Sequence, residues 1–126
     1  MGSISNTRNT NGAMSERRRH IRYAGDGLMV WLDGRIYPAI DVSLGGVRLS
    51  GVQPVKRGAV VDLKLIPCHG EAMMLALAAN VQGQVLAAGP SGIRLAFVGT
   101  GYSLAKTVVR HARRQALDGA FNSPVG

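Results

Sequence analysis

Large apolar residues recur at every second position along two stretches of the chain, residues 59–66 and 93–98. In the first stretch Val61, Leu63 and Leu65 fall on one face, and polar residues lie between them. Successive side chains of a β-strand point to opposite sides, so this pattern predicts two strands with one buried face each. Shorter apolar stretches predict three further strands, at residues 28–32, 35–42 and 47–50.

Turn-forming residues separate these predicted strands. Asp33-Gly34 is typical of a two-residue hairpin turn, because both positions of such a turn favour a positive φ. Pro38 lies inside the returning strand and cannot donate a backbone hydrogen bond, so we expect one edge to be unpaired there. Further turns are predicted at residues 67–70 and 89–92.

Residues 71–81 are ambiguous between helix and strand. Their Glu, Ala, Met and Leu residues favour a helix by intrinsic propensity. The segment nevertheless lies between strands, and the alternation continues beyond it to Val85. We predict a long strand with a bend or a bulge near Gly83.

The last element is predicted to be a helix over residues 101–119. Leu104, Val108, Ala112 and Ala116 recur every four residues on one face, whereas most basic residues lie away from that face. Ser103 is the expected N-cap, and Gly119 is the expected residue after the helix end.

Several short strands followed by one helix predict a mainly β fold, a small antiparallel β-barrel of about six strands with a C-terminal α-helix packed on it. A length of 126 residues indicates one domain. We expect a disordered tail at residues 1–13, the barrel with a basic arm at residues 14–100, the helix at 101–119 and a frayed tail at 120–126.

The charge balance predicts an anionic partner. The formal net charge is +8, from 15 Lys and Arg residues against 7 Asp and Glu residues. Two groups contain eight of these cations: Arg17, Arg18, Arg19 and Arg22 in the arm, and Lys106, Arg110, Arg113 and Arg114 in the helix. We expect the cations of the helix to serve mainly solubility, and the alternative for this face is the docking of a partner.

The cysteine content, the lack of a targeting segment and the lack of catalytic motifs predict a cytoplasmic protein that is not an enzyme. A single cysteine, Cys68, permits no intramolecular disulfide, which fits a reducing compartment. We see no signal peptide, and no apolar run is long enough for a membrane-spanning helix. The histidines are scattered, and we find no paired carboxylates or catalytic triad. We therefore expect no catalytic residue, metal or cofactor.

Two short motifs lie one hairpin apart, and together they are more specific than either alone. Arg18 and Arg22 form Arg-x-x-x-Arg, and Asp41, Ser43 and Gly46 form Asp-x-Ser-x-x-Gly. In this order, with β-patterned sequence after them, the motifs resemble the PilZ family of bacterial receptors for cyclic diguanylate (cyclic di-GMP). The resemblance covers roughly residues 16–100. It implies a PilZ-like barrel of the split-barrel type.

The resemblance also assigns roles to residues of this chain. It implies that Arg18 and Arg22 contact phosphate and the Hoogsteen edge of guanine, in an arm that wraps over the ligand. The turn from Asp41 to Gly46 would form the floor beneath a guanine. Arginine at position 17 implies two stacked ligands per domain. One departure from common members is Ile21, where proline often precedes the second arginine.

The residue types suit this ligand. A guanidinium group can bond two phosphate oxygens in parallel, reach guanine O6 and N7, or stack on a base. Asp41 and Ser43 can hold a turn and offer acceptors to guanine N–H groups, while Gly45 and Gly46 allow a close approach. The predicted ligand-binding residues are Arg17, Arg18, Arg22, Asp41, Ser43, Gly45 and Gly46.

We therefore expect a receptor that relays occupancy by cyclic di-GMP to an unidentified downstream protein, without membrane insertion. One alternative is a sequence-tolerant nucleic-acid binder. The charge supports it, but an aromatic content of 5% offers few stacking platforms. The other alternative is a protein adaptor that needs no ligand, against which the two intact motifs argue.

Overall fold

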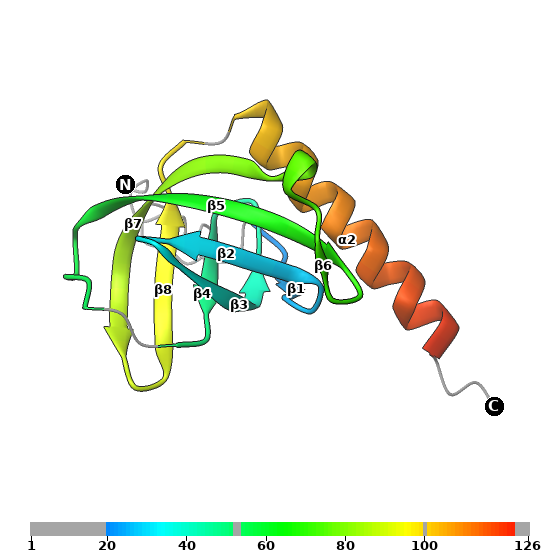
Figure 1. Cartoon of the computed structure of the whole chain (residues 1–126), viewed down its shortest axis with the longest axis horizontal. Helices are drawn as coiled ribbons and strands as arrows, with labels where there is room; N and C mark the ends of the chain where they lie inside the picture. Colours follow the sequence, from blue (N-terminus) through cyan, green and yellow to red (C-terminus); the bar gives the residue numbers. More distant parts are fainter. Residues whose placement is uncertain (1–19, 52–53, 100, 123–126) are drawn as a thin grey trace, which may run out of the picture.

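The computed structural model describes residues 20–51, 54–99 and 101–122 (Figure 1). The predicted N-terminal tail, the part of the basic arm before His20, and the last four residues lie outside the described residues. Among the predicted site residues, Arg17 and Arg18 are therefore outside them, whereas Arg22, Asp41 and the turn that follows are described.

Six antiparallel strands form a closed barrel, as the sequence predicts. The strand order is β3-β2-β5-β7-β8-β4, and β4 pairs back with β3 to close the ring. These strands are β2 (Leu28–Leu32), β3 (Arg35–Val42), β4 (Gly46–Leu49), β5 (Val60–His69), β7 (Ala79–Gly89) and β8 (Gly92–Phe97). Two short strands are added to the ring: β1 (Tyr23–Ala24) pairs with β3, and β6 (Ala72–Met73) pairs with β5.

The β2–β3 hairpin turns at Asp33-Gly34, as predicted. Both residues have a positive φ, 52° for Asp33 and 85° for Gly34, as this tight turn requires. After the turn, β3 pairs with β2 through residues 35–38 and with β4 through residues 39–42. Pro38 thus lies just beyond the end of the β4 ladder, where a missing N–H removes no ladder bond.

Inward-facing side chains of the barrel strands form the core, and the outward positions between them are more exposed. Each buried Leu, Ile or Val contributes about 1.5–3 kcal/mol through removal of its surface from water. The fully buried members from the strands include Leu28, Val30, Leu32, Val42, Leu49, Leu63, Leu65, Val85 and Ile93.

Two predicted boundaries between β5 and β7 are wrong. The turn predicted at residues 67–70 begins too early, because β5 continues through Pro67 to His69. Pro67 is tolerated since it opposes Leu28, the first residue of β2, where that ladder ends. The strand predicted over residues 71–81 is replaced by β6, by the 3-10 turn η1 (Leu75–Leu77), and by β7 from Ala79 onward.

The physical reason is that η1 has no buried residue, so no alternation between core and solvent is imposed on it. The local preference of this segment for helical turns then decides its conformation. The bulge predicted near Gly83 lies in the same strand, between Val85 and Ala87. Gly83 leaves room for the buried Leu63, because an added Cβ would lie 2.7 Å from its Cδ1 atom and the leucine would have to shift.

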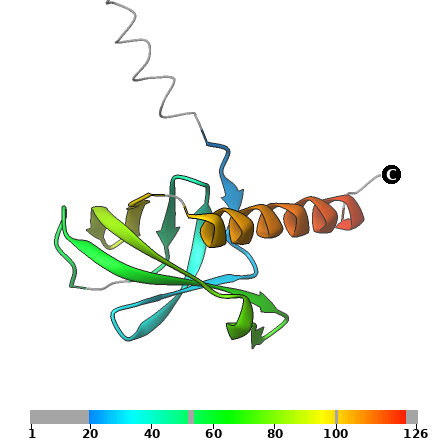
Figure 2. The ribbon, with the colours of Figure 1, turned by 90° about the horizontal axis from the view of Figure 1, so that it is seen from above.

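The C-terminal helix α2 (Tyr102–Asn122) packs on one side of the barrel (Figures 1 and 2). The amide of Ala105 donates to the carbonyl of Gly101 at 3.0 Å, so the helix begins before Ser103, which is not its N-cap. The helix also continues beyond Gly119, the predicted end. In the described residues, no helix is long and apolar enough to cross a membrane.

The buried face of α2 differs in part from the predicted one. Leu104 and Val108 are buried as expected, but Thr107 and His111 are buried too, and Ala116 is exposed. The cause is helix geometry, because positions spaced every four residues drift around the axis by about 40° per step. Residues spaced alternately three and four apart stay on one side of a helix, so Leu104, Thr107, Val108 and His111 all face the barrel.

Three side chains of α2 bond backbone carbonyls of the barrel, two of them near β1 and one on β5. His111 Nε2 lies 2.6 Å from the oxygen of Ala24, and Arg114 Nη1 donates to Cys68 at 2.8 Å. Gln115 Nε2 donates to the oxygen of Asp26 at 2.7 Å. The bonds to Ala24 and Asp26 attach the helix to the segment that directly follows the basic arm, and the bond to Cys68 attaches it to β5.

Candidate anion-binding site

The turn between β3 and β4 is held by Ser43. Its Oγ accepts the N–H groups of Gly45 at 3.0 Å and Gly46 at 3.2 Å, and its own N–H donates to Gly46 O at 2.9 Å. A hydroxyl that bonds backbone amides two and three residues ahead is typical of a capped turn. Ser43 therefore has a structural role.

Gly45 and Gly46 are glycines for reasons of space. A Cβ on Gly46 would lie 2.4 Å from the carbonyl oxygen of Leu95, on the paired strand β8. A Cβ on Gly45 would lie 2.7 Å from Cδ2 of His20, the first described residue of the arm. Gly46 thus permits the strand pairing, and Gly45 permits the chain before β1 to lie against the turn.

Asp41 is placed between two arginines. Its carboxylate lies 3.4 Å from Arg22 Nη1 and 3.1 Å from Arg48 Nη2. The Asp41 side chain is 18% exposed, whereas Arg22 and Arg48 are 56% and 43% exposed. Asp41 on β3 is opposite Arg48 on β4 and Ala24 on β1, so the strand register fixes this arrangement.

Two cations of this site were not predicted from the sequence. Arg48 on β4 is directly opposite Arg94 on β8. Like charges in this position repel each other, a cost that an anion between them would offset. The Nε atom of Arg48 is also buried without a hydrogen-bond partner. Arg48 follows the core residue Val47, and Arg94 precedes the core residue Leu95, so both arginines point outward. Only the pairing of β4 with β8 makes them neighbours.

These residues line one cavity of about 300 Å³ on the outside of the barrel. All the predicted site residues that the structure describes contribute to it. The cavity is lined by His20, Arg22, Asp41, Ser43, Gly45, Gly46, Val47, Arg48, Leu86, Arg94, Leu95 and Ala96. With three arginines against one carboxylate, it can hold an anion.

The lining residues of the cavity include no Phe, Tyr or Trp, and the His20 ring is its one aromatic group. A base bound there would lie against backbone, guanidinium groups and the imidazole of His20 rather than on a large aromatic ring. In the part of the chain that the structure describes, no group of three His, Cys, Asp or Glu residues is arranged to hold a metal ion.

Comparison with known proteins bears on the fold alone. No protein-family model and no curated protein matches the sequence. Among solved structures, the chain is similar to an uncharacterized protein from Legionella, with 15% sequence identity and a TM-score of 0.56. The match covers 78% of this chain and 97% of the Legionella chain. At this identity the similarity shows a shared fold.

Proposed function

We propose that this chain is a single-domain bacterial receptor for cyclic di-GMP, and that it relays occupancy to a partner protein in the cytoplasm. The observation that supports the proposal is the composition of one cavity. Arg22, Asp41, Ser43, Gly45 and Gly46 come from two motifs separated in sequence, and all of them line that cavity.

The chemistry of the cavity fits a cyclic dinucleotide. Arg22, Arg48 and Arg94 offer donors for phosphate oxygens, for guanine O6 and N7, or for stacking on a base. The carboxylate of Asp41 offers acceptors to guanine N–H groups. The turn at Gly45 and Gly46 has no side chain to keep a base away from the backbone.

The resemblance to PilZ proteins adds two arginines to this site. Arg18 precedes Arg22 by four residues, and Arg17 is adjacent to it. Both would bring their guanidinium groups to the ligand, and Arg17 would allow a second, stacked molecule of cyclic di-GMP. Movement of the arm onto the ligand would be the conformational signal.

A single-stranded nucleic acid is the weaker candidate for the same cavity. Sequence-tolerant binders stack successive bases on several aromatic side chains, and this cavity has only the His20 ring in its lining, with no Phe, Tyr or Trp. The cations alone would still attract an oligonucleotide at low salt. An oligonucleotide is therefore the appropriate competitor in a binding experiment.

The test compares Arg22→Ala and Asp41→Ala with Arg35→Ala, an exposed arginine of β3 that does not line the cavity. Binding of labelled cyclic di-GMP is measured by equilibrium dialysis. The first two variants should lose at least tenfold in affinity, as expected for charge-assisted hydrogen bonds, and Arg35→Ala should bind as the unmodified chain does. Equal binding by all three variants would contradict the proposal, as would displacement of the label by a random oligonucleotide at physiological salt.

A further inference from the structure

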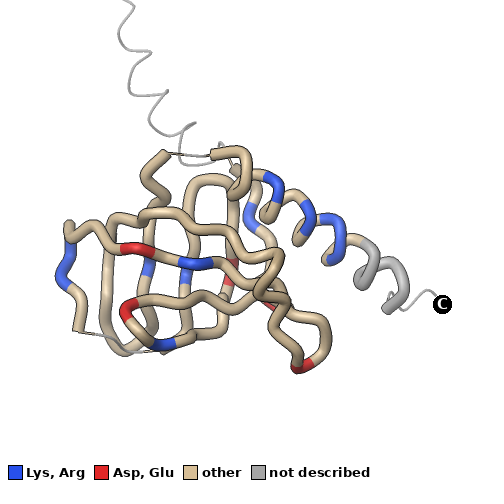
Figure 3. Tube along the Cα trace, turned by 45° about the horizontal axis from the view of Figure 1, so that its top comes forward, with Lys and Arg blue, Asp and Glu red and all other residues tan. Residues whose placement is uncertain are grey.

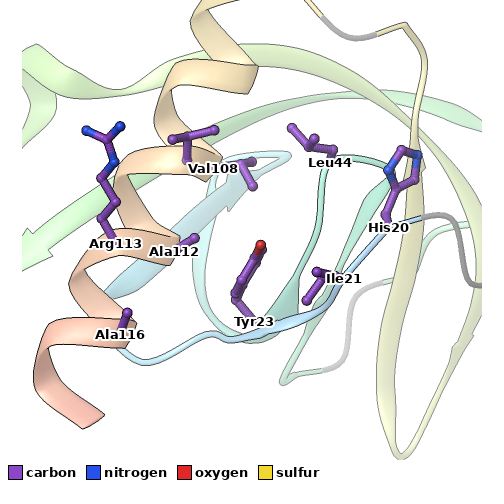
Figure 4. A pocket seen from close by; sticks show the side chains of 9 residues that line it. His20, Ile21, Tyr23, Leu44, Val108, Ala112, Arg113 and Ala116 are labelled. Atoms are coloured by element: carbon purple, nitrogen blue, oxygen red, sulfur yellow. The ribbon is translucent and has the colours of Figure 1, made fainter. Parts of the chain in front are cut away.

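A second cavity, larger and more apolar, lies between α2 and the chain before β1 (Figure 4). Its volume is about 480 Å³. For comparison, an apolar cavity of about 150 Å³ holds a benzene ring. The cavity is lined by His20, Ile21, Tyr23, Leu44, Val108, Val109, Ala112, Arg113 and Ala116. We name it the helix groove.

An outward apolar stripe on α2 continues from one wall of the helix groove. Residues 102, 105, 109, 112 and 116 are Tyr, Ala, Val, Ala and Ala, with alternate spacings of three and four. This is the spacing of a helix that packs against another helix. Tyr102 is 81% exposed and Val109 is 44% exposed, whereas Ala105 and Ala112 are half-buried, so the described chain leaves much of the stripe open. The neighbouring face of α2, with Leu104 and Val108, already packs on the barrel, and Val108 also lines the groove.

The charges beside this stripe have one sign. Lys106 and Arg113 are exposed, and Arg110 is half-buried. Between Tyr102 and Ala116 the sequence has four cations and no acidic residue. Figure 3 shows the cations along the helix. A partner with carboxylates at the matching positions would form ion pairs there.

We propose that the helix groove and the outward stripe of α2 bind an acidic amphipathic helix of a partner protein. Large apolar side chains of that helix enter the groove beside Val109 and Ala112, and its carboxylates meet Lys106 and Arg113. This is the helix-in-groove mode of recognition, in which anchors are spaced three or four residues apart. The binding itself does not rest on the proposed receptor function.

Charge and shape argue against three other occupants. A second copy of the chain would bring the same cations face to face. The first nineteen residues have four arginines and one acid, so they too carry the wrong charge. A bilayer surface is flat, whereas the apolar floor of this groove includes the buried Val108 and is recessed between α2 and residues 20–23.

The helix groove also adjoins the candidate anion-binding site, because His20 lines both cavities. A ligand that moves the arm would therefore change one wall of the groove. This coupling, unlike the docking, rests on the proposed function. Measuring the docking with and without cyclic di-GMP separates the two.

The test titrates the ¹⁵N-labelled full chain with a synthetic helical peptide of about three heptads, with Leu at the a and d positions and Glu at the e and g positions. Two control peptides have Lys in place of Glu, or the same residues with the Leu positions scrambled. Amide shifts should concentrate on Ile21, Tyr23, Val109 and Ala112. Val109→Gln should weaken binding about fivefold, from the lost apolar contact.

The matched variant is Val60→Gln, which makes the same change at a 53% exposed position on β5, outside the groove. It should bind the acidic peptide as the unmodified chain does. The proposal would be overturned if the acidic peptide did not bind, or if the amide shifts were confined to other surfaces. It would also be overturned if the Lys peptide bound with equal affinity, or if Val109→Gln did not weaken binding. Self-association of the chain that Val109→Gln abolishes would also overturn the proposal, as would binding to anionic lipid vesicles that the same variant abolishes. Peptide binding without cyclic di-GMP supports the docking even if the nucleotide does not bind.

Discussion

Asp41 and Arg48 are direct neighbours across β3 and β4, with the Asp41 Oδ2 atom 3.1 Å from the Arg48 Nη2 atom. Arg22 reaches the other oxygen of the same carboxylate at 3.4 Å. One acidic side chain thus orients two cations at the edge of a cavity. An arriving phosphate would compete with this carboxylate for both guanidinium groups.

Arg48→Met tests whether this arrangement serves binding more than folding. Ion pairs as exposed as this one contribute at most about 1 kcal/mol to stability, so the free energy of unfolding should change little. The affinity for cyclic di-GMP should fall about tenfold, as expected for a lost charge-assisted contact. Urea denaturation and calorimetric titration measure the two effects.

Arg57→Met is the matched control, since Arg57 is exposed in the loop before β5 and does not line the cavity. Its affinity and its stability should both remain unchanged. A variant of Arg48 that binds the ligand normally would exclude this residue from the site.

Gly46→Ala and Gly45→Ala should differ although the residues are adjacent. The new Cβ at position 46 would meet the Leu95 backbone, so β4 and β8 must separate, at a cost of about 1–3 kcal/mol of stability. At position 45 it would meet the exposed His20 ring, which can move away. Thermal unfolding compares both with Gly89→Ala, whose Cβ would meet nothing within 4 Å. Equal destabilisation at positions 45 and 46 would refute this account.

Arg114→Met should loosen α2, because Arg114 Nη1 donates to the carbonyl of Cys68 on the barrel. Loss of a hydrogen bond from a charged donor costs about 1.5–3 kcal/mol, reduced here because Arg114 is only half-buried. Amide hydrogen exchange of α2 should accelerate. Arg113→Met, at an exposed position of the same helix, should leave exchange unchanged. Equal exchange rates in the two variants would show that this bond does not hold the helix.

The sequence predicts the barrel because its signals are local. Asp33-Gly34 fixes one hairpin, and alternation in β5 and β8 assigns their buried faces. It does not predict η1, because the exposed Leu75–Leu77 segment has no core contact that imposes a pattern. It also misses the buried His111, a polar residue that can be buried because the Ala24 carbonyl lies opposite it.

The candidate site is predictable in part for a related reason. Arg22, Asp41 and Ser43 belong to short motifs that can be recognised in the chain itself. Arg48 and Arg94 are 46 positions apart in sequence, and only the pairing of β4 with β8 makes them neighbours. The pattern of residues within one strand does not tell which residue of another strand will lie opposite it.

Calorimetric titration of the purified full chain with cyclic di-GMP, with GMP as the control nucleotide, tests the central claim most directly. We predict saturable heat for cyclic di-GMP alone, with a midpoint near two molecules per chain. A midpoint of one molecule would retain the receptor and contradict the role inferred for Arg17. Absence of saturable heat, or equal binding of GMP, would contradict the claim that the cavity around Asp41 recognises the cyclic dinucleotide.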